Sequence, residues 1–340
     1  MSRLAVLGAG SWGTVLAAVF AHHGHDVALW CRSAEHAATM AATRRSARAA
    51  PELRLPPNVV ATASLSQALD GAEVVLFALP TDAMRVVAET VVPFLAPHAA
   101  LLSCAKGFER ESGLRMTELL AQVIPSAVDR VAALSGPNLA AEIAAGHPAA
   151  SVIACADRRL GLQLQQLLSS PQLRLYTNVD VLGVEYAGAL KNCMAIAAGV
   201  ADGLKMGVNT RSALVTRGLA EMTRLGTAAG AQPLTFAGLA GLGDLIATCS
   251  SPLSRNYQVG LRLAGGETWP RIVADLGHVA EGVNTTVVAR GLASRYAVRT
   301  PIIDRAYEVL FENRSVSAAL GDLVTGAPRD ELLELHQVTA

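Results

Sequence analysis

The chain has 340 residues, of which 51% are hydrophobic, 16% are charged and 4% are aromatic. This length is typical of two domains, and this hydrophobic content is typical of a folded chain. The 28 basic and 28 acidic residues give a net charge of zero. That balance, together with the scarcity of aromatic residues, argues against nucleic acid as a partner.

Two uncharged stretches, residues 4–25 and 225–243, are interrupted by several glycines. Neither predicts a signal peptide or a membrane-spanning helix. The five cysteines are spread along the chain, with no spacing typical of metal ligands. We therefore expect reduced thiols, a cytoplasmic location and no metal site.

The first half of the chain alternates short apolar runs with helix-like segments. Helices are expected at residues 12–22 and 82–92, and residues 51–58 are expected to form a loop. Strands are expected at residues 4–7, 25–30, 73–79, 99–104, 131–134, 151–154 and 173–176. Short buried strands joined by helices predict a mainly parallel sheet covered on both faces.

The pattern changes near residue 178, after which the apolar residues follow helical spacing. Helices are expected at residues 181–202, 211–229, 272–276, 284–295 and 301–313. We therefore predict an N-terminal α/β Rossmann-like dinucleotide-binding domain over residues 1–177. An all-α C-terminal substrate domain is predicted over residues 178–340.

The sequence GAGSWG at residues 8–13 fits the pattern G-x-G-x-x-G between a predicted strand and a predicted helix. In such a turn, Gly8 permits the sharp bend, Gly10 lets a pyrophosphate approach, and Gly13 lets helix and strand pack closely. The free N–H groups at the start of the helix attract phosphate. We therefore expect a dinucleotide here, and the alternative is an ordinary glycine-rich turn.

The end of the second predicted strand bears on the choice of cofactor. NAD sites usually place Asp or Glu there to bind the ribose, whereas this chain has Arg32. A guanidinium suits a 2′-phosphate, so NADPH is predicted to be preferred, with NADH also possible. Arg44, Arg45 and Arg48 follow and are interpreted as a solvated helix face.

Lys191 lies in a segment of small and apolar residues, with no acidic residue three or four positions away. A lysine desolvated in such a setting has a lowered pKa and can act as a general acid or base. The alternative is a lysine that reaches solvent at the edge of a helix. Spacing alone leaves both interpretations open.

Further polar residues are candidates for the same pocket. Asp244 and Thr248 are four residues apart and share a helix face, and residues 254–256 offer several donors to a phosphate. The alternative is a glycine-rich connection followed by a helix cap. Lys106 and residues 135–138 each follow a predicted strand, where ligands of open α/β sheets bind.

At these motifs the chain resembles the bacterial-type NAD(P)-dependent glycerol-3-phosphate dehydrogenases. The matching motifs occur in the family's order over nearly the whole chain: GAGSWG (8–13), AKGFE (105–109), SGPN (135–138), GALKN (188–192), TRGLAEMTRLG (216–226), GLAGLGDLIATC (239–249), SRN (254–256) and AEG (280–282). The resemblance implies reduction of dihydroxyacetone phosphate to sn-glycerol 3-phosphate for glycerophospholipid synthesis, by a homodimer. Asn138-Leu139 departs from the family, which more often has a small hydroxyl residue followed by Phe.

The resemblance also implies a role for each matching residue. Lys191 would protonate the substrate carbonyl oxygen and take the proton back in reverse, while Lys106 would stabilise the developing alkoxide. Asp244 would orient Lys191, with Asn192 and Thr248 close by. The substrate would contact Lys106, Gly136, Asn138, Lys191, Asp244, Ser254, Arg255 and Asn256. The cofactor would contact Gly8, Gly10, Ser11, Trp12, Gly13, Arg32, Lys106, Ala140, Arg255, Val279 and Glu281.

Two other functions compete with this one. A related two-domain reductase would act on another small acid, such as 2-ketopantoate or a 3-hydroxyacid. A non-catalytic NADPH-binding module would use Lys191 only structurally. Residues 254–256 favour a phosphorylated substrate, because a carboxylate substrate needs no phosphate clamp.

Overall fold

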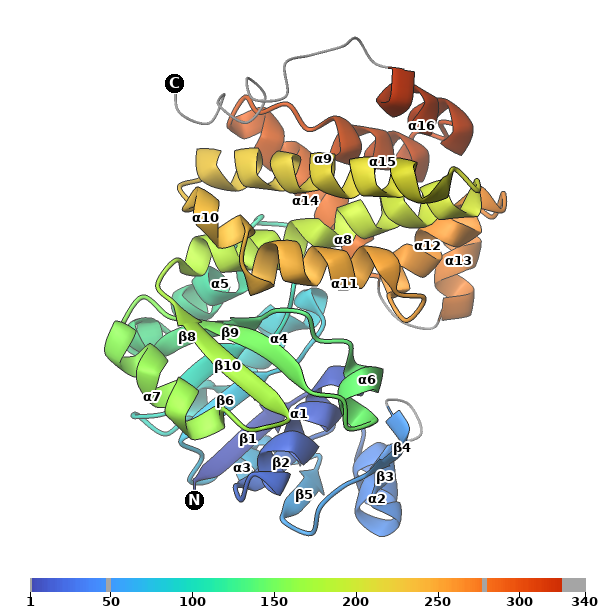
Figure 1. Cartoon of the computed structure of the whole chain (residues 1–340). Coiled ribbons are helices and arrows are strands. Elements are labelled where there is room, and N and C mark those ends of the chain that lie inside the picture. Colours follow the sequence, from blue (N-terminus) through green and yellow to red (C-terminus); the bar gives the residue numbers. More distant parts are fainter. Residues whose placement is uncertain (1, 47–49, 277–279, 326–340) are drawn as a thin grey trace. The chain divides into compact units, whose positions relative to one another are not determined.

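The computed structural model describes residues 2–46, 50–276 and 280–325 (Figure 1). The chain forms two compact units. Unit 1 contains the chain up to Ala105 and Met116–Val181, and unit 2 contains Lys106–Arg115 and the chain from Leu182 onward. This division differs from the predicted one, which placed residues 106–115 in the first domain. The reason is that this segment contacts helix α8 (Val181–Gly203) and Asp244, both in unit 2.

Unit 1 is built on an eight-stranded sheet with the order β10-β9-β8-β7-β6-β1-β2-β5. Its strands are β1 (Arg3–Leu7), β2 (Asp26–Trp30), β5 (Val59–Thr62), β6 (Val74–Phe77), β7 (Ala100–Ser103), β8 (Val131–Ser135), β9 (Ala149–Ala154) and β10 (Leu173–Asn178). All neighbouring pairs are parallel except β8 with β9. The run from β5 to β8 has the strand order of dinucleotide-binding folds, so the predicted Rossmann-like sheet is confirmed.

Helices connect these strands and cover the sheet. They are α1 (Ser11–His22), α2 (Ala34–Thr43), α3 (Leu65–Leu69), α4 (Thr81–Val91), η1 (Val92–Phe94), α5 (Met116–Val123), η2 (Pro125–Arg130), α6 (Ala140–Ala144) and α7 (Arg158–Leu168). Residues Leu4–Leu7 of β1 are completely buried, as is expected of a central parallel strand covered on both faces.

Two short strands and β5 were not predicted. β3 (Arg45–Ser46) and β4 (Ala50–Arg54) pair antiparallel. β4 takes up the first part of the loop expected over residues 51–58, and Arg45 lies in β3 and not on the helix face that was expected. β5 has only four residues, and only its first and last, Val59 and Thr62, are buried, so it lacks the longer buried apolar run that identified the other strands. Its pairing with β2 is therefore a tertiary effect that the local sequence does not show.

Arg44 does not lie on a solvated helix face, and that interpretation was wrong for this residue. It ends α2 in a left-handed conformation with φ of 57°. Its guanidinium donates to the carbonyl oxygens of Leu55, at 3.2 Å, and Val59, at 2.8 Å. Arg44 therefore fastens the end of α2 to the following segment, and Arg48 lies outside the described residues.

Among the described residues from 182 onward, the regular elements are all helical, as predicted. They are α8, α9 (Gly207–Ala228), α10 (Pro233–Phe236), η3 (Leu239–Gly243), α11 (Asp244–Ser250), α12 (Arg255–Ala264), α13 (Trp269–Leu276), α14 (Glu281–Arg295), α15 (Pro301–Phe311) and α16 (Val316–Thr325). α8 is buried along most of its length because small and apolar residues occur on all of its faces.

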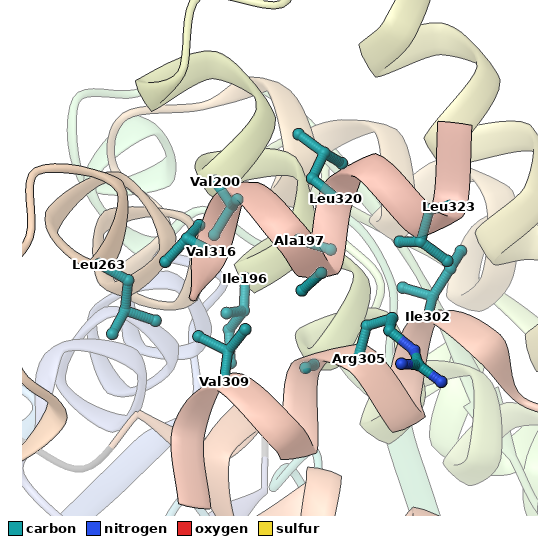
Figure 2. Close-up of a pocket in the computed structure, with 12 residues that line it drawn as sticks. Ile196, Ala197, Val200, Leu263, Ile302, Arg305, Val309, Val316, Leu320 and Leu323 are labelled. Carbon is teal, nitrogen blue, oxygen red and sulfur yellow. The ribbon is translucent and has the colours of Figure 1, made fainter. Parts of the chain in front are cut away.

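α8 and α12 cross with their backbones in contact. A Cβ atom at Gly199 would lie 2.1 Å from the carbonyl oxygen of Tyr257, and one at Gly260 would lie 2.0 Å from that of Ile196. Both glycines are therefore required by the crossing itself. Near it, α8, α12, α15 and α16 line an apolar pocket (Figure 2), whose labelled side chains include Ile196 and Leu263.

One segment of unit 2, Pro233–Ser250, is long and apolar enough to cross a membrane by length and composition alone. It is not one continuous helix, because it comprises α10, η3 and α11. It also contains Asp244, whose carboxylate pairs with two lysines of the same unit. These features are typical of a core segment of a folded domain.

The helix crossing predicts the effect of adding one methyl group. We expect Gly199→Ala to lower the free energy of unfolding by about 1–3 kcal/mol, because the Cβ atom overlaps backbone. Gly291→Ala on α14 is the matched control: its Cβ atom meets nothing within 4 Å, and it should be neutral or stabilising by about 0.5–1 kcal/mol. Urea denaturation measures both. Equal stability of the two variants would contradict the close crossing.

Candidate active site

The glycine-rich turn joins β1 to α1 through close backbone contacts. Gly8 has φ of 111°, and its N–H donates to the carbonyl oxygen of Trp30 at 3.1 Å. A Cβ atom at Gly13 would lie 1.9 Å from the carbonyl oxygen of Gly8. A Cβ atom at Gly10 would meet nothing within 4 Å. The turn itself thus requires glycine at positions 8 and 13, and the space at Gly10 is open.

Several donors at this turn suit a bound dinucleotide. Gly10 caps α1 without a side-chain hydrogen bond, so the first N–H groups of the helix have no side-chain cap. The indole Nε1 of Trp12 is buried and has no hydrogen-bond partner among the described residues. Arg32 is exposed just after β2, the strand whose last residue, Trp30, contacts Gly8. A phosphate-bearing cofactor fits this arrangement of free donors and open space.

The other predicted cofactor residues are scattered over both units. Ala140 is the first residue of α6, which packs against α1 in unit 1. Glu281 is the first residue of α14 in unit 2. Ser11 begins α1, and Val279 lies outside the described residues.

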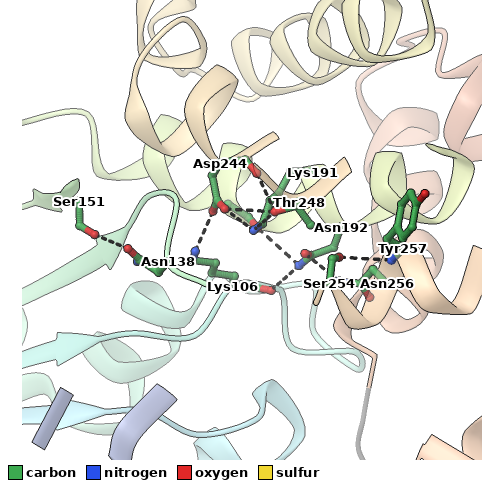
Figure 3. Close-up of polar contacts among 11 residues, drawn as sticks. Lys106, Asn138, Ser151, Lys191, Asn192, Asp244, Thr248, Ser254, Asn256 and Tyr257 are labelled. Carbon is green, nitrogen blue, oxygen red and sulfur yellow. Dashed lines mark hydrogen bonds and ion pairs between the residues drawn. The ribbon is translucent and has the colours of Figure 1, made fainter. Parts of the chain in front are cut away.

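Within unit 2, two lysines share one buried carboxylate (Figure 3). The Nζ atom of Lys106 lies 2.7 Å from Oδ2 of Asp244, and the Nζ atom of Lys191 lies 2.5 Å from Oδ1. Lys191 also donates to the hydroxyl of Thr248 at 2.7 Å. We call Lys106, Asp244 and Lys191 the lysine–aspartate triad. The structure thus brings together residues that are 138 and 53 positions apart in the sequence.

Burial controls the charges of the triad. Asp244 is 1% exposed and Lys191 is 6% exposed. Burial, and secondarily the charge of Lys106, lower the pKa of Lys191 to about 8, against the opposing effect of Asp244. Burial alone would raise the pKa of the Asp244 carboxyl. The two lysines together lower it by a larger amount, so this pKa lies below its ordinary value. The triad therefore holds an ionised carboxylate beside a lysine that titrates near neutral pH.

A chain of amide hydrogen bonds holds the surrounding elements in register. The Gly282 N–H donates to Oδ1 of Asn256 at 3.0 Å, and Nδ2 of Asn256 donates to Oδ1 of Asn192 at 2.9 Å. Nδ2 of Asn192 in turn donates to the carbonyl oxygen of Lys106 at 3.1 Å. This chain joins α14, α12, α8 and the segment Lys106–Arg115. Both ends of the Asn256 amide are engaged by protein groups.

The other two residues of the SRN motif differ in their surroundings. Ser254 caps α12 and accepts a hydrogen bond from the N–H of Tyr257 at 3.3 Å. Arg255 is exposed and has no hydrogen-bond or ion-pair partner within the described part of the chain. It is therefore the residue of this motif whose charge is available to an anion.

Gly136 and Asn138 lie in unit 1, after β8. Gly136 has φ of 141°, and a Cβ atom there would lie 2.9 Å from Cα of Ser151. Asn138 accepts a hydrogen bond from the Ser151 hydroxyl, and its Nδ2 is buried with no partner among the described residues. This free donor stands where the family more often has a hydroxyl residue.

The sequence contains a sign of the triad that the motif analysis missed. Only three of the 28 basic residues are lysine: Lys106, Lys191 and Lys205. Two of these three bind Asp244. Arginine cannot replace lysine where a proton must be exchanged near neutral pH, so a scarce lysine in an arginine-rich chain is informative.

Two family models cover most of the chain. The model for the N-terminus of NAD-dependent glycerol-3-phosphate dehydrogenase matches residues 3–161, and the model for the C-terminus matches residues 180–321. The chain is 45% identical over 330 residues to a glycerol-3-phosphate dehydrogenase (NAD(P)+) of Geobacter metallireducens, covering 97% of this chain and 98% of that one. It is 44% identical to one of Lacticaseibacillus casei, covering 97% and 96%.

Solved structures give the same result. The crystal structure of glycerol-3-phosphate dehydrogenase from Coxiella burnetii superposes with a TM-score of 0.90 at 35% identity, covering 95% of this chain and 99% of that one. A ketopantoate reductase from Ralstonia eutropha reaches a TM-score of 0.59 at 18% identity, covering 94% and 99%. The second similarity shows a shared fold.

The triad predicts a large penalty for removing its negative charge. We expect Asp244→Asn to lower the free energy of unfolding by about 3 kcal/mol at pH 7, because the lysines then face each other without a counter-charge. The penalty should be smaller above pH 9, where Lys191 is neutral. Asp275→Asn removes an exposed partner of Arg262 and is the matched control, with an expected change below about 1 kcal/mol. An equal change for both variants in urea denaturation would refute the buried triad.

Proposed function

The chain belongs to the NAD-dependent glycerol-3-phosphate dehydrogenase family, and we propose that Lys191 is the general acid and base of its reaction. That reaction is the reversible NAD(P)H-dependent reduction of dihydroxyacetone phosphate to sn-glycerol 3-phosphate, which supplies glycerophospholipid synthesis. The observation that carries the proposal is a buried lysine with a pKa of about 8 held against Asp244. A general acid–base works best when its pKa lies near the working pH.

The nicotinamide cofactor supplies the hydride when it is bound. In reduction, the Lys191 ammonium donates its proton to the carbonyl oxygen of the substrate as that oxygen gains negative charge. Lys106 stabilises the same developing charge with its ammonium group. In oxidation, the neutral amine of Lys191 removes the proton from the substrate hydroxyl. Asp244 and Thr248 keep the Nζ atom of Lys191 in one position through both directions.

We further propose that Arg255 is the main ligand of the substrate phosphate. Its support is the absence of a competing partner among the described residues, together with its place at the start of α12 next to Ser254. Asn256 and Asn192 contribute by holding α12 and α8 in register. The substrate contacts of Gly136 and Asn138 stay predictions, supported by the free Nδ2 donor of Asn138.

For the cofactor, we propose that Gly8, Gly10, Ser11, Trp12 and Gly13 surround the pyrophosphate. The open space at Gly10 and the unpaired Nε1 of Trp12 support this assignment. We propose that Arg32 binds the 2′-phosphate, so that NADPH is preferred and NADH is also used. The contacts of Ala140, Glu281, Lys106 and Arg255 with the cofactor also stay predictions.

Two properties of the whole protein are proposed on the family resemblance. We propose that it is a homodimer, which sedimentation equilibrium would measure. We also propose that it acts in the cytoplasm, and the five cysteines, all free and buried, support a reducing compartment.

The acid–base role predicts opposite pH profiles for the two directions. The kcat/KM for reduction should fall above about pH 8, where Lys191 loses its proton, and that for oxidation should fall below it. Lys191→Ala should lower kcat about 100- to 10,000-fold while the Kd for NADPH stays unchanged. The exposed Lys205→Ala is the matched control and should keep full activity.

Two results would overturn the assignment. Unchanged turnover by Lys191→Ala would remove this lysine from the reaction. Reduction of 2-ketopantoate in place of dihydroxyacetone phosphate would identify a different substrate.

Cofactor choice gives an independent prediction. Arg32→Glu should raise the Kd for NADPH roughly 10- to 100-fold, because a charge-assisted bond to the 2′-phosphate is lost, and should change the Kd for NADH far less. Arg174→Glu is the matched control, because Arg174 lies on β10, the edge strand on the opposite side of the sheet from β2, which precedes Arg32. Fluorescence titration measures both cofactors. Equal losses for NADPH and NADH would refute the 2′-phosphate role.

A further inference from the structure

The segment Lys106–Arg115 is a small closed loop that belongs to unit 2. It follows the end of β7, and the chain then returns to unit 1 at α5. Phe108 and Arg115 form an isolated antiparallel bridge, and the Glu109 N–H donates to the carbonyl oxygen of Leu114 at 2.9 Å. The loop carries Lys106 at its first position and Arg115 at its last. The bridge brings Arg115 back beside Phe108, two residues after Lys106.

Three contacts fasten this loop to α8. At its start, the carbonyl oxygen of Lys106 accepts from Asn192, two helical turns after Glu185. Inside the loop, the ring of Phe108 meets that of Tyr186 edge to face, with ring centres 5.1 Å apart. At its end, Nη1 of Arg115 donates to Oε2 of Glu185 at 2.7 Å.

The Arg115–Glu185 contact is the charged one among these three. The side chain of Glu185 is 5% exposed and that of Arg115 is 19% exposed, so solvent screens the pair poorly. Breaking a buried ion pair by removing one partner is far more costly than breaking a surface pair. The hydrogen bond at the start of the loop, from the side-chain amide of Asn192 to the carbonyl oxygen of Lys106, joins two neutral groups and is weaker.

We propose that the Arg115–Glu185 ion pair is a positioning element of the reaction, which holds the loop on α8 so that Lys106 stays beside Asp244, the partner of Lys191. This inference rests on the proposed function, because it assigns Lys191 as the acid and base. Neither Arg115 nor Glu185 is proposed to touch the substrate.

A displacement of Lys106 would change the pKa of Lys191 in one direction. The charged and titratable groups that act on it are Asp244, Lys106 and Cys249. Lys106 lowers the pKa of Lys191 by repulsion, whereas Asp244 raises it. Burial raises the pKa of the Cys249 thiol to about 12, so it stays neutral over the working range. If the loop relaxes and Lys106 withdraws, Lys191 keeps Asp244 and loses the repulsion, so its pKa rises.

The test compares Arg115→Met, Arg115→Lys and Glu185→Gln with the wild-type chain. Arg290→Met is the matched control, because it breaks the exposed Arg290–Glu312 pair of the same unit, 2.8 Å long. The chain has only three lysines, so an NMR spectrum of protein labelled at the lysine ε-carbon reports Lys191 directly. The second readout is the pH profile of kcat/KM for dihydroxyacetone phosphate reduction.

We expect Arg115→Met and Glu185→Gln to lower kcat/KM about 10- to 100-fold by misplacing Lys106. Both should also move the titration of Lys191, and the falling limb of the profile, to higher pH. Arg115→Lys should restore most of the activity, and Arg290→Met should match wild type. Glu185→Gln keeps nearly the same shape, so it decides the question if Arg115→Met does not fold.

Folded Arg115→Met or Glu185→Gln protein with an unmoved Lys191 titration would overturn the positioning role, even if activity fell. A failure of the proposed function looks different. In that case the kcat/KM of the wild-type protein for reduction would not fall near pH 8, or Lys191→Ala would remain active.

Discussion

Asp244 is almost completely buried, and a carboxylate in such a place is stable only when cations or donors satisfy both of its oxygens. Lys106 satisfies one oxygen and Lys191 the other. These two contacts tie α11, α8 and the segment Lys106–Arg115 to a single point. The same burial that makes the two lysines necessary as counter-charges also lowers the pKa of Lys191. The fold of unit 2 and its proposed acid–base function thus depend on one charge.

Helices near this carboxylate approach each other closely enough for backbone contact. Gly199 and Gly260 let α8 and α12 touch, and a Cβ atom at Gly282 would lie 2.7 Å from the carbonyl oxygen of Asn192. Such close approach leaves little freedom for sliding, so the amides of Asn192 and Asn256 meet in one register. The glycines of unit 2 thereby position polar groups, as Gly8 and Gly13 do at the turn before α1.

Much of this could be predicted from sequence, and the failures have physical causes. The strands that form the centre of the sheet are continuous apolar runs, and the motif at Gly8–Gly13 has a strict local geometry, so both are visible locally. β5 and the Arg44 cap depend on partners distant in sequence. The same is true of Arg115 and Glu185, which are 70 residues apart, and of the assignment of Lys106 to unit 2. Spacing identified Lys191 as unusual, but its pairing with Asp244 came only from the resemblance and is now seen directly.

The central claim is that burial against Asp244 and Lys106 brings the proton of Lys191 into the working pH range. The most direct measurement is a pH titration of the three lysine ε-carbon resonances by NMR, with Lys191 assigned by the signal lost in Lys191→Ala. We predict a midpoint of about 8 for Lys191. If Lys191 instead titrated near the ordinary lysine value of about 10.4, the buried triad would not control its proton, and the acid–base role would be contradicted.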